Sequence, residues 1–200
     1  GTSFMVESRG YLLTAAHLLR EAVHPVVVNT APTGVFAPLA LDSGAVHPVE
    51  IVAQTPERDL ALLKMEVQAE TPAAPDYLGN PETIQEGTFL AALGFSFGHF
   101  RIHNIMVMGG LLAAKVISPN GTNLLILDSA SHPGDPGGPL INTEDGRIIG
   151  IIQGVFDPTE LVPESPSEDY RIPSRFTYAV SIEYAQPLLE NAGIEKNTVV

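Results

Sequence analysis

The 200-residue chain contains no cysteine and no tryptophan, and charged residues make up only 16% of it. Without cysteine, the chain cannot be a disulfide scaffold, a thiolate enzyme or a cysteine-ligated metal protein. Ten basic residues stand against 23 acidic ones, which gives a net charge of −13. Because an acidic surface repels phosphate groups, we expect no nucleic-acid partner. No apolar run reaches the roughly 18–20 residues of a membrane-spanning helix, so we expect no membrane insertion.

Turn residues, in contrast, are abundant, with 18 glycines and 17 prolines. They separate about a dozen short apolar runs, a pattern typical of an all-β barrel or sandwich. Helical patterns are sparse. Segment 181–192 predicts a short C-terminal helix that begins at Ser181 and stops at Gly193, although Pro187 fits poorly in its middle.

Two stretches rich in proline and acidic residues interrupt the strand pattern. Segment 66–81 predicts a connection between two halves of the chain. Segment 157–174 contains four prolines and predicts a long surface loop, of the kind that forms lids and binding loops.

Three segments carry residue types that catalysis uses. The apolar run 13–17 ends in His17, Asp59 opens the apolar run 60–63, and 134–139 is a glycine-rich turn. Each has an ordinary structural explanation when taken singly, as a surface histidine, a strand cap or a plain turn. Histidine, aspartate and a glycine-rich turn in this chain order are, however, the elements of a triad that activates a nucleophile.

The ordered set resembles the trypsin/chymotrypsin superfamily of serine proteases, and within it the cysteine-free bacterial HtrA-like branch. Gly-Thr-Ser-Phe at 1–4 and Leu-Thr-Ala-Ala-His at 13–17 match the first signature of that family, and Asp-Leu-Ala-Leu-Leu at 59–63 matches the second. Gly-Asp-Pro-Gly-Gly-Pro at 134–139, which we call the elbow, matches the third except at one residue. Leu-Gly-Phe-Ser-Phe-Gly at 93–98 resembles a turn of the HtrA-like branch.

The resemblance implies two six-stranded antiparallel β-barrels and a short C-terminal helix. The N-terminal barrel, 1–80, then carries His17 and Asp59, and the C-terminal barrel, 81–200, carries the elbow. It implies neither a cofactor nor a metal ion.

The exception in the elbow is Pro136, which stands where the family has its nucleophilic serine. Proline has no hydroxyl for His17 to activate and no backbone N–H, so the family's oxyanion hole retains only the N–H of Gly134. Losing the nucleophile alone costs about 10⁶ in rate, so we predict that the chain does not cleave peptides. Ser129 and Ser131 lie too far upstream to replace it.

The resemblance also implies a peptide-binding cleft. Ala130 is expected at the base of the first specificity pocket, where an apolar floor favours a small or aliphatic side chain. Ile152, Gln153 and Gly154 are expected to offer a strand edge along which an extended peptide pairs, an interaction that needs no nucleophile. We therefore expect a peptide or unfolded protein segment as partner.

Three functions stay open at this point. The first is a pseudoprotease that binds peptides without cleaving them. The second is a serine endopeptidase inactivated by a serine-to-proline change at position 136. The third is a structural or interaction module of a larger protein. No signal peptide is visible in the sequence, while the family analogy favours a periplasmic or secreted protein and allows a trimer without fixing the oligomeric state.

Overall fold

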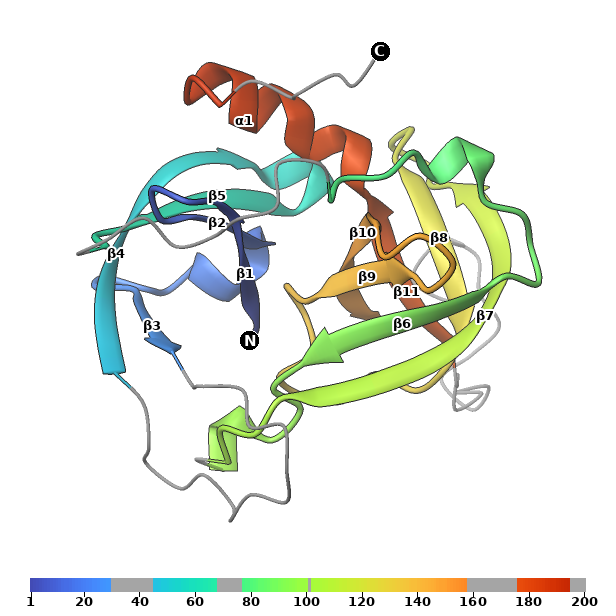
Figure 1. Cartoon of the computed structure of the whole chain (residues 1–200), viewed down its shortest axis with the longest axis horizontal. Coiled ribbons are helices and arrows are strands. Elements are labelled where there is room, and N and C mark those ends of the chain that lie inside the picture. The colour runs from blue at the N-terminus through green and yellow to red at the C-terminus, as the bar shows by residue number, and fades with distance from the viewer. Residues whose placement is uncertain (30–44, 68–76, 101, 158–175, 195–200) are drawn as a thin grey trace.

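The structure, a computed structural model, describes residues 1–29, 45–67, 77–100, 102–157 and 176–194. Two β units lie side by side, with the C-terminal helix across one end (Figure 1). The strands in chain order are β1 (Ser3–Glu7), β2 (Tyr11–Ala15), β3 (Val26–Asn29), β4 (Ala45–Thr55), β5 (Leu60–Met65), β6 (Phe89–Gly94), β7 (Met106–Ile117), β8 (Asn123–Asp128), β9 (Pro139–Asn142), β10 (Ile148–Val155) and β11 (Phe176–Ser181).

The N-terminal unit is a five-stranded antiparallel sheet in the order β1-β2-β5-β4-β3. Its central strand β5 is an almost continuous apolar run because both of its faces are covered. The mostly-β prediction is confirmed, but the described residues of this unit form a half-barrel sheet rather than the expected six-stranded barrel.

The C-terminal unit is a closed antiparallel barrel in the order β10-β11-β8-β7-β6-β9, as the resemblance implied. Along β7 exposed and more buried residues alternate, so one face of the strand points into the barrel and the other to solvent. The inner face of the barrel is packed with aliphatic side chains such as Leu90, Leu112, Leu127 and Leu140.

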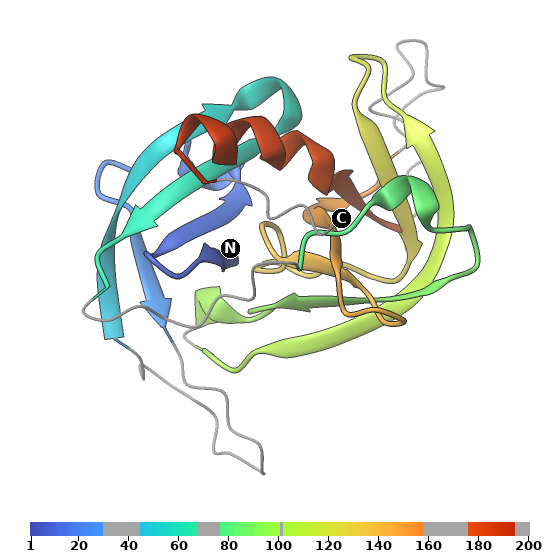
Figure 2. The same cartoon turned by 45° about the horizontal axis from the view of Figure 1, so that its top comes forward.

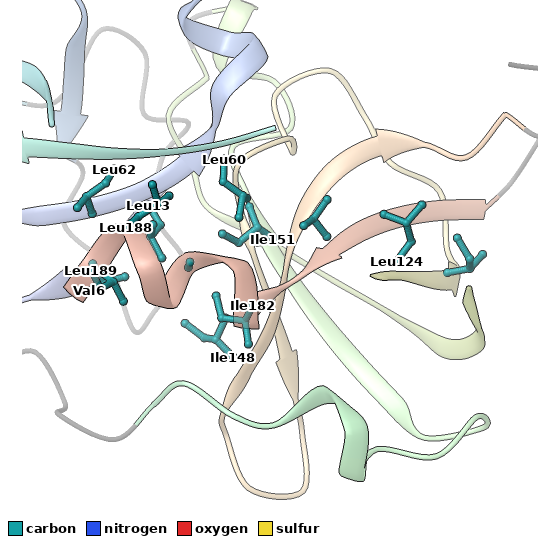
Figure 3. Close-up of a cluster of buried hydrophobic side chains, with 13 residues drawn as sticks. Val6, Leu13, Leu60, Leu62, Leu124, Ile148, Ile151, Ile182, Leu188 and Leu189 are labelled. Atoms are coloured by element: carbon teal, nitrogen blue, oxygen red, sulfur yellow. The ribbon is translucent and has the colours of Figure 1, made fainter. Parts of the chain in front are cut away.

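A shared hydrophobic cluster joins the two units (Figure 3). Leu13, Leu60 and Leu62 of the sheet belong to the same buried cluster as Ile151 of the barrel and Leu188 of the helix. Because this cluster spans the interface, the ends of β2, β5 and β10 are held in a fixed relation to one another. His17 and Asp59 lie just beyond the ends of β2 and β5, and Gln153 lies near the end of β10.

The C-terminal helix returns from the barrel to the N-terminal sheet. After β11 the chain forms a 3-10 helix, η7 (Ile182–Ala185), and then α1 (Gln186–Asn191), which lies along the sheet (Figure 2). Ser181 stands at the N-cap of η7 without a side-chain capping bond, and Pro187 lies in the first turn of α1. Proline fits there because its missing N–H has no intrahelical partner to lose.

The predicted connection 66–81 and the predicted loop 157–174 are described only in part. Residues 77–79 pair with β10, since the Ile148 N–H donates to the Tyr77 carbonyl and the Gly79 N–H donates to the Ile148 carbonyl. The domain boundary after residue 80 stays a prediction, and residues 158–174 lie outside the described residues. None of the helices in the described ranges is long and apolar enough to cross a membrane.

Candidate functional site

The side chains of His17 and Asp59 form a hydrogen-bonded pair beside the N-terminal sheet. His17 lies in the 3-10 helix η1 (Ala16–Leu19) after β2, and Asp59 stands between the 3-10 helix η2 (Pro56–Arg58) and β5. Nδ1 of His17 lies 2.6 Å from Oδ2 of Asp59, and the two side chains are 30% and 25% exposed. A carboxylate at Nδ1 favours the tautomer with its proton there, which leaves Nε2 as the acceptor nitrogen.

Backbone bonds hold this pair in place. The pairing of Ala15 with Leu60 brings the end of β2 beside the start of β5. The Ala16 N–H then donates to the Asp59 carbonyl at 3.0 Å, and the His17 N–H donates to Oδ1 of Asp59 at 2.7 Å. Asp59 adopts a left-handed conformation with φ 54°, which aspartate tolerates better than most residues. The carboxylate is therefore oriented by a backbone donor as well as by the imidazole.

The elbow is a tight turn that packs against strand β10. The Asp135 N–H donates to the His132 carbonyl, and the Gly138 N–H donates to the Asp135 carbonyl, each at 3.0 Å. Gly137 has φ +90°, and a Cβ atom there would overlap the Thr2 carbonyl oxygen. Only glycine fits this position, because the conformation and the space both exclude a side chain.

Thr2 ties the elbow to the N-terminal sheet. Its N–H donates to the Pro136 carbonyl at 2.8 Å, and its hydroxyl donates to the Gly134 carbonyl at 2.7 Å. The same hydroxyl accepts the Phe95 N–H at 3.0 Å, while the Thr2 carbonyl accepts the Thr14 hydroxyl at 2.6 Å. Sequence reasoning treated Thr2 as part of a strand signature only. No local pattern reveals that one residue joins three segments.

Gly134 carries the N–H that the resemblance assigns to the oxyanion hole. Its φ is +115°, and a Cβ atom would collide with the Phe95 carbonyl oxygen. Its own carbonyl is held by Thr2, and within the described ranges its N–H has no acceptor. Pro136, the other position expected to contribute a donor, has no N–H. Of the two positions expected to supply a donor, only Gly134 therefore has an N–H, and its place in an oxyanion hole stays a prediction.

The Asp135 side chain is fully buried, and its hydrogen bonds hold the elbow in place. Oδ1 accepts the Ser96 hydroxyl at 2.5 Å, and Oδ2 accepts the His132 N–H at 2.6 Å. Nδ1 of His132 lies 3.6 Å from Oδ2. These bonds join the turn 93–98 to the elbow. The sequence pointed to both segments, but not to the carboxylate that links them.

Ala130 lines a small cavity beside the elbow, with Ser129 and Ser131 next to it. The cavity has a volume of about 10 Å³, which is hardly room for one water molecule. Met108 and Ile152 are among the other residues that line it. Polar residues, including both serines, contribute to the lining, and the cavity is too small for a ligand side chain, so the role of Ala130 as the base of a specificity pocket stays a prediction.

The predicted strand edge at Ile152, Gln153 and Gly154 is only partly available. The Ile152 N–H donates to the Gly138 carbonyl at 2.9 Å, and its carbonyl accepts the Gly137 N–H at 2.7 Å, so both of its groups are occupied by the elbow. Beyond it β10 has a bulge at Gln153 and is paired with β11. In the described part of the chain, no strand pairs with the other edge of Gln153 and Gly154.

Gln153 also connects β10 to the histidine–aspartate pair. Its Nε2 donates to the Asp59 carbonyl at 3.2 Å. Strand β10 is thus hydrogen-bonded to the elbow through Ile152 and to Asp59 of the histidine–aspartate pair through Gln153. One strand therefore fixes the two parts of the site relative to each other. No group of three or more His, Asp or Glu side chains within the described residues has the arrangement of a metal site.

Curated relatives share sequence with most of the chain. A probable periplasmic serine endoprotease, DegP-like, from Pseudomonas fulva is 30% identical over 159 residues, which are 78% of this chain and 29% of that protein. Magnetosome formation protease MamE from Paramagnetospirillum magneticum is 29% identical over 164 residues, 79% of this chain and 20% of that protein. The chain therefore spans less than a third of the length of these relatives.

Solved structures of HtrA-type proteases share its fold. The HtrA-type protease AlgW with a tripeptide has a TM-score of 0.69 and 26% identity, covering 98% of this chain and 56% of that chain. The AlgW complex with a decapeptide gives the same TM-score at 25% identity, covering 96% of this chain and 50% of that one. The model of the trypsin-like peptidase domain family matches residues 1–151. With the His17–Asp59 pair, the glycine-rich elbow and these similarities in view, the chain belongs to the trypsin-like peptidase domain family, with its relatives in the HtrA-like branch.

Proposed function

We propose that this protein is a pseudoprotease, which binds an extended polypeptide segment in the former active-site cleft without cleaving it. The single observation that carries the proposal is Pro136 at the expected nucleophile position, in an elbow whose backbone is held by hydrogen bonds. In the family mechanism the histidine removes a proton from a serine hydroxyl as the oxygen attacks the peptide carbonyl. Proline supplies no such oxygen.

The chemistry is impaired at a second point as well. A tetrahedral intermediate carries negative charge on the former carbonyl oxygen, and two backbone donors normally stabilise it. Here Gly134 offers an N–H and Pro136 does not. The loss of one donor costs on the order of 10²–10³ in rate, so even a nucleophile from elsewhere would meet a weakened hole.

Binding, in contrast, needs only backbone groups and side-chain pockets. Gln153 and Gly154 lie on a strand with one unpartnered edge in the described part of the chain, next to the elbow. An extended segment adds to such an edge by main-chain hydrogen bonds. HtrA-type relatives have been solved with a tripeptide and with a decapeptide, which supports a peptide as the ligand here. The names of the DegP-like relatives support a periplasmic location.

The test is cleavage of casein by the unaltered chain and by Pro136→Ser. We expect no turnover by the unaltered chain, and turnover by it would overturn the proposal. A further variant that combines Pro136→Ser with His17→Ala is the matched control, because any triad-dependent activity gained by the serine must vanish with the histidine.

A second candidate is an endopeptidase that lost its activity through one substitution. The observation in its favour is the His17–Asp59 hydrogen bond of 2.6 Å, the geometry that an active triad requires. This candidate predicts that Pro136→Ser alone gains His17-dependent cleavage. Silence of both the unaltered chain and Pro136→Ser favours a cleft that has been given over to binding.

A further inference from the structure

The segment that leads into Asp59 has little support of its own. It is η2, a single 3-10 turn in which no residue is buried, and Asp59 follows it with a positive φ. Short 3-10 turns have poorer hydrogen-bond geometry than α-helices, and a left-handed residue other than glycine persists only where its surroundings fix it. The groups that hold η2 must therefore come from other elements.

Two contacts join η2 to the turn between β7 and β8. The Arg58 guanidinium donates to the Thr122 hydroxyl and lies 3.5 Å from the Asn120 carbonyl oxygen. In the opposite direction, Nδ2 of Asn120 donates to the Glu57 carbonyl at 2.9 Å. The two residues directly before Asp59 are therefore both attached to the C-terminal barrel.

The turn, residues 118–122, is held by its own hydrogen bonds. The Gly121 N–H donates to the Ser118 carbonyl at 2.8 Å, and the Thr122 hydroxyl donates to Oδ1 of Asn120 at 2.7 Å. Thr122 is buried, and because a hydroxyl has only one hydrogen to donate, its oxygen remains an acceptor for an incoming donor. The turn thus presents a fixed acceptor to the guanidinium.

Tyr184 of η7 contacts the same guanidinium through its ring. The Arg58 guanidinium carbon lies 4.5 Å from the ring centroid, a distance at which a planar cation is attracted to an aromatic face. The Tyr184 hydroxyl accepts the Asn123 N–H at 3.0 Å, so the ring is itself fixed to the start of β8. Arg58 therefore connects η2 to two further elements, which are the turn after β7 and η7.

We propose that Arg58 is a positioning residue for the His17–Asp59 pair. Its contacts fix η2, η2 fixes the backbone of Asp59, and that backbone aims the carboxylate at the imidazole, where Oδ2 lies 2.6 Å from Nδ1. Arg58 acts through Asp59 and is not a catalytic residue. The inference concerns the pair alone, so it does not depend on whether the cleft binds a peptide.

The test follows one proton, the one on Nδ1 of His17. Its exchange with water is measured by NMR at pH 7 on protein with isotope-labelled histidine, and His17→Gln identifies its signal. Arg58→Met removes the charge and the donors of the guanidinium. We expect the proton to exchange about tenfold faster or more, because a charge-assisted hydrogen bond that supports Asp59 is lost.

Arg9→Met is the matched control. Arg9 also lies over a tyrosine ring, that of Tyr11, and is also bonded to a polar group, the Glu7 carboxylate. We expect this variant to leave the exchange of the His17 proton unchanged. Arg58→Lys keeps the charge but not the planar group, so it should speed the exchange by a smaller factor. This milder variant keeps the test valid if Arg58→Met does not fold.

The backbone amides of β8 separate positioning from a merely structural role, because their exchange reports the opening of the whole fold. Faster exchange at His17 with unchanged β8 amides supports the proposal. If the His17 proton and the β8 amides speed up by the same factor, Arg58 only stabilises the fold and the proposal is wrong. It is also wrong if Arg58→Met and Arg9→Met give the same exchange rate at His17.

Discussion

The N-terminal and C-terminal sides of the site differ in which groups of a catalytic triad they contain. On the N-terminal side, Asp59 is bonded to the ring and the backbone N–H of His17, so both side chains have the arrangement a triad needs. On the C-terminal side the elbow has a tightly held backbone, yet Pro136 supplies neither the hydroxyl nor the N–H. The framework is intact on both sides, while the reacting group is missing on one.

The framework of the site is built from hydrogen bonds that do not involve a side chain at position 136. Asp59 closes the junction of β2 and β5, and Thr2 and Asp135 hold the elbow by hydrogen bonds that stabilise the fold whether or not a serine is present. Loss of the nucleophile removes none of these bonds. These bonds give Asp59, Thr2 and Asp135 a structural role of their own, so the presence of such residues alone does not demonstrate activity.

The largest effect is expected where the two sides meet, at Gly137. Gly137→Ala forces a side chain into a positive φ and against the Thr2 carbonyl, so we expect a loss of about 3 kcal/mol or more in the free energy of unfolding. Gly121→Ala is the control, because Gly121 has φ +78° with open space around it, and we expect a loss of only about 1 kcal/mol. Urea denaturation measures both. Equal losses of unfolding free energy in the two variants would mean that a side chain at position 137 does not collide with the Thr2 carbonyl.

The second-largest effect is expected for Thr2→Val, which removes the side-chain hydrogen bonds that join the elbow to the N-terminal sheet. Valine preserves the shape but leaves the Gly134 carbonyl and the Phe95 N–H without their partner, at a cost of about 2–3 kcal/mol. Thr83→Val removes an exposed bond to the Asn80 carbonyl and should cost about 0.5 kcal/mol or less. Comparable unfolding free energies for the two variants would show that the tie contributes nothing.

Asp59→Asn tests the histidine–aspartate pair on the N-terminal side of the site. We expect the free energy of unfolding to fall by about 1–2 kcal/mol, because a charged hydrogen-bond acceptor at His17 is replaced by a neutral one. Nitrogen NMR of the histidine ring should show the proton leaving Nδ1 as the dominant site. Asp145→Asn, which affects an exposed turn bonded to the Arg147 N–H, serves as the control. An unchanged ring spectrum in Asp59→Asn contradicts the role assigned to the carboxylate.

The smallest effect concerns the edge of the N-terminal sheet, away from the site. Burial alone raises the pKa of Glu7, but hydrogen bonds from Arg9 and Ser8 outweigh it and hold the pKa below its usual value. A carboxyl group whose pKa is lower in the folded state than in the unfolded state stabilises the fold when the pH is above the unfolded-state pKa. This stabilisation is lost as the pH falls through the folded-state pKa. Glu7→Gln should therefore cost about 0.5 kcal/mol at pH 7, and the difference should vanish in acid.

Melting temperatures of Glu7→Gln and the unaltered chain at pH 7 and pH 3 measure this effect. Glu144→Gln, on an exposed turn, is the control. A difference that persists unchanged at pH 3 would exclude the pairing with Arg9 as its cause.

Sequence reasoning was successful where the information is local. The alternation of short apolar runs and turns predicted a mostly-β chain, and the ordered motifs at His17, Asp59 and the elbow indicated the family. The short C-terminal helix predicted over 181–192 is confirmed, but its first turn is a 3-10 helix, so Pro187 lies in the first turn of α1 and not in the middle of a helix. Helix type depends on how the segment packs on the sheet, which no local pattern encodes.

The sequence by itself determined that the elbow has no hydroxyl at position 136, because a residue's chemistry does not depend on its surroundings. Only the tertiary structure decided that the cavity at Ala130 is small, that the backbone groups of Ile152 are bonded to the elbow and that Gln153 lines a much larger cavity. Those properties depend on contacts between residues far apart in the chain. Cavity volumes and free strand edges are what remains after such contacts form, so they become visible only in the folded molecule.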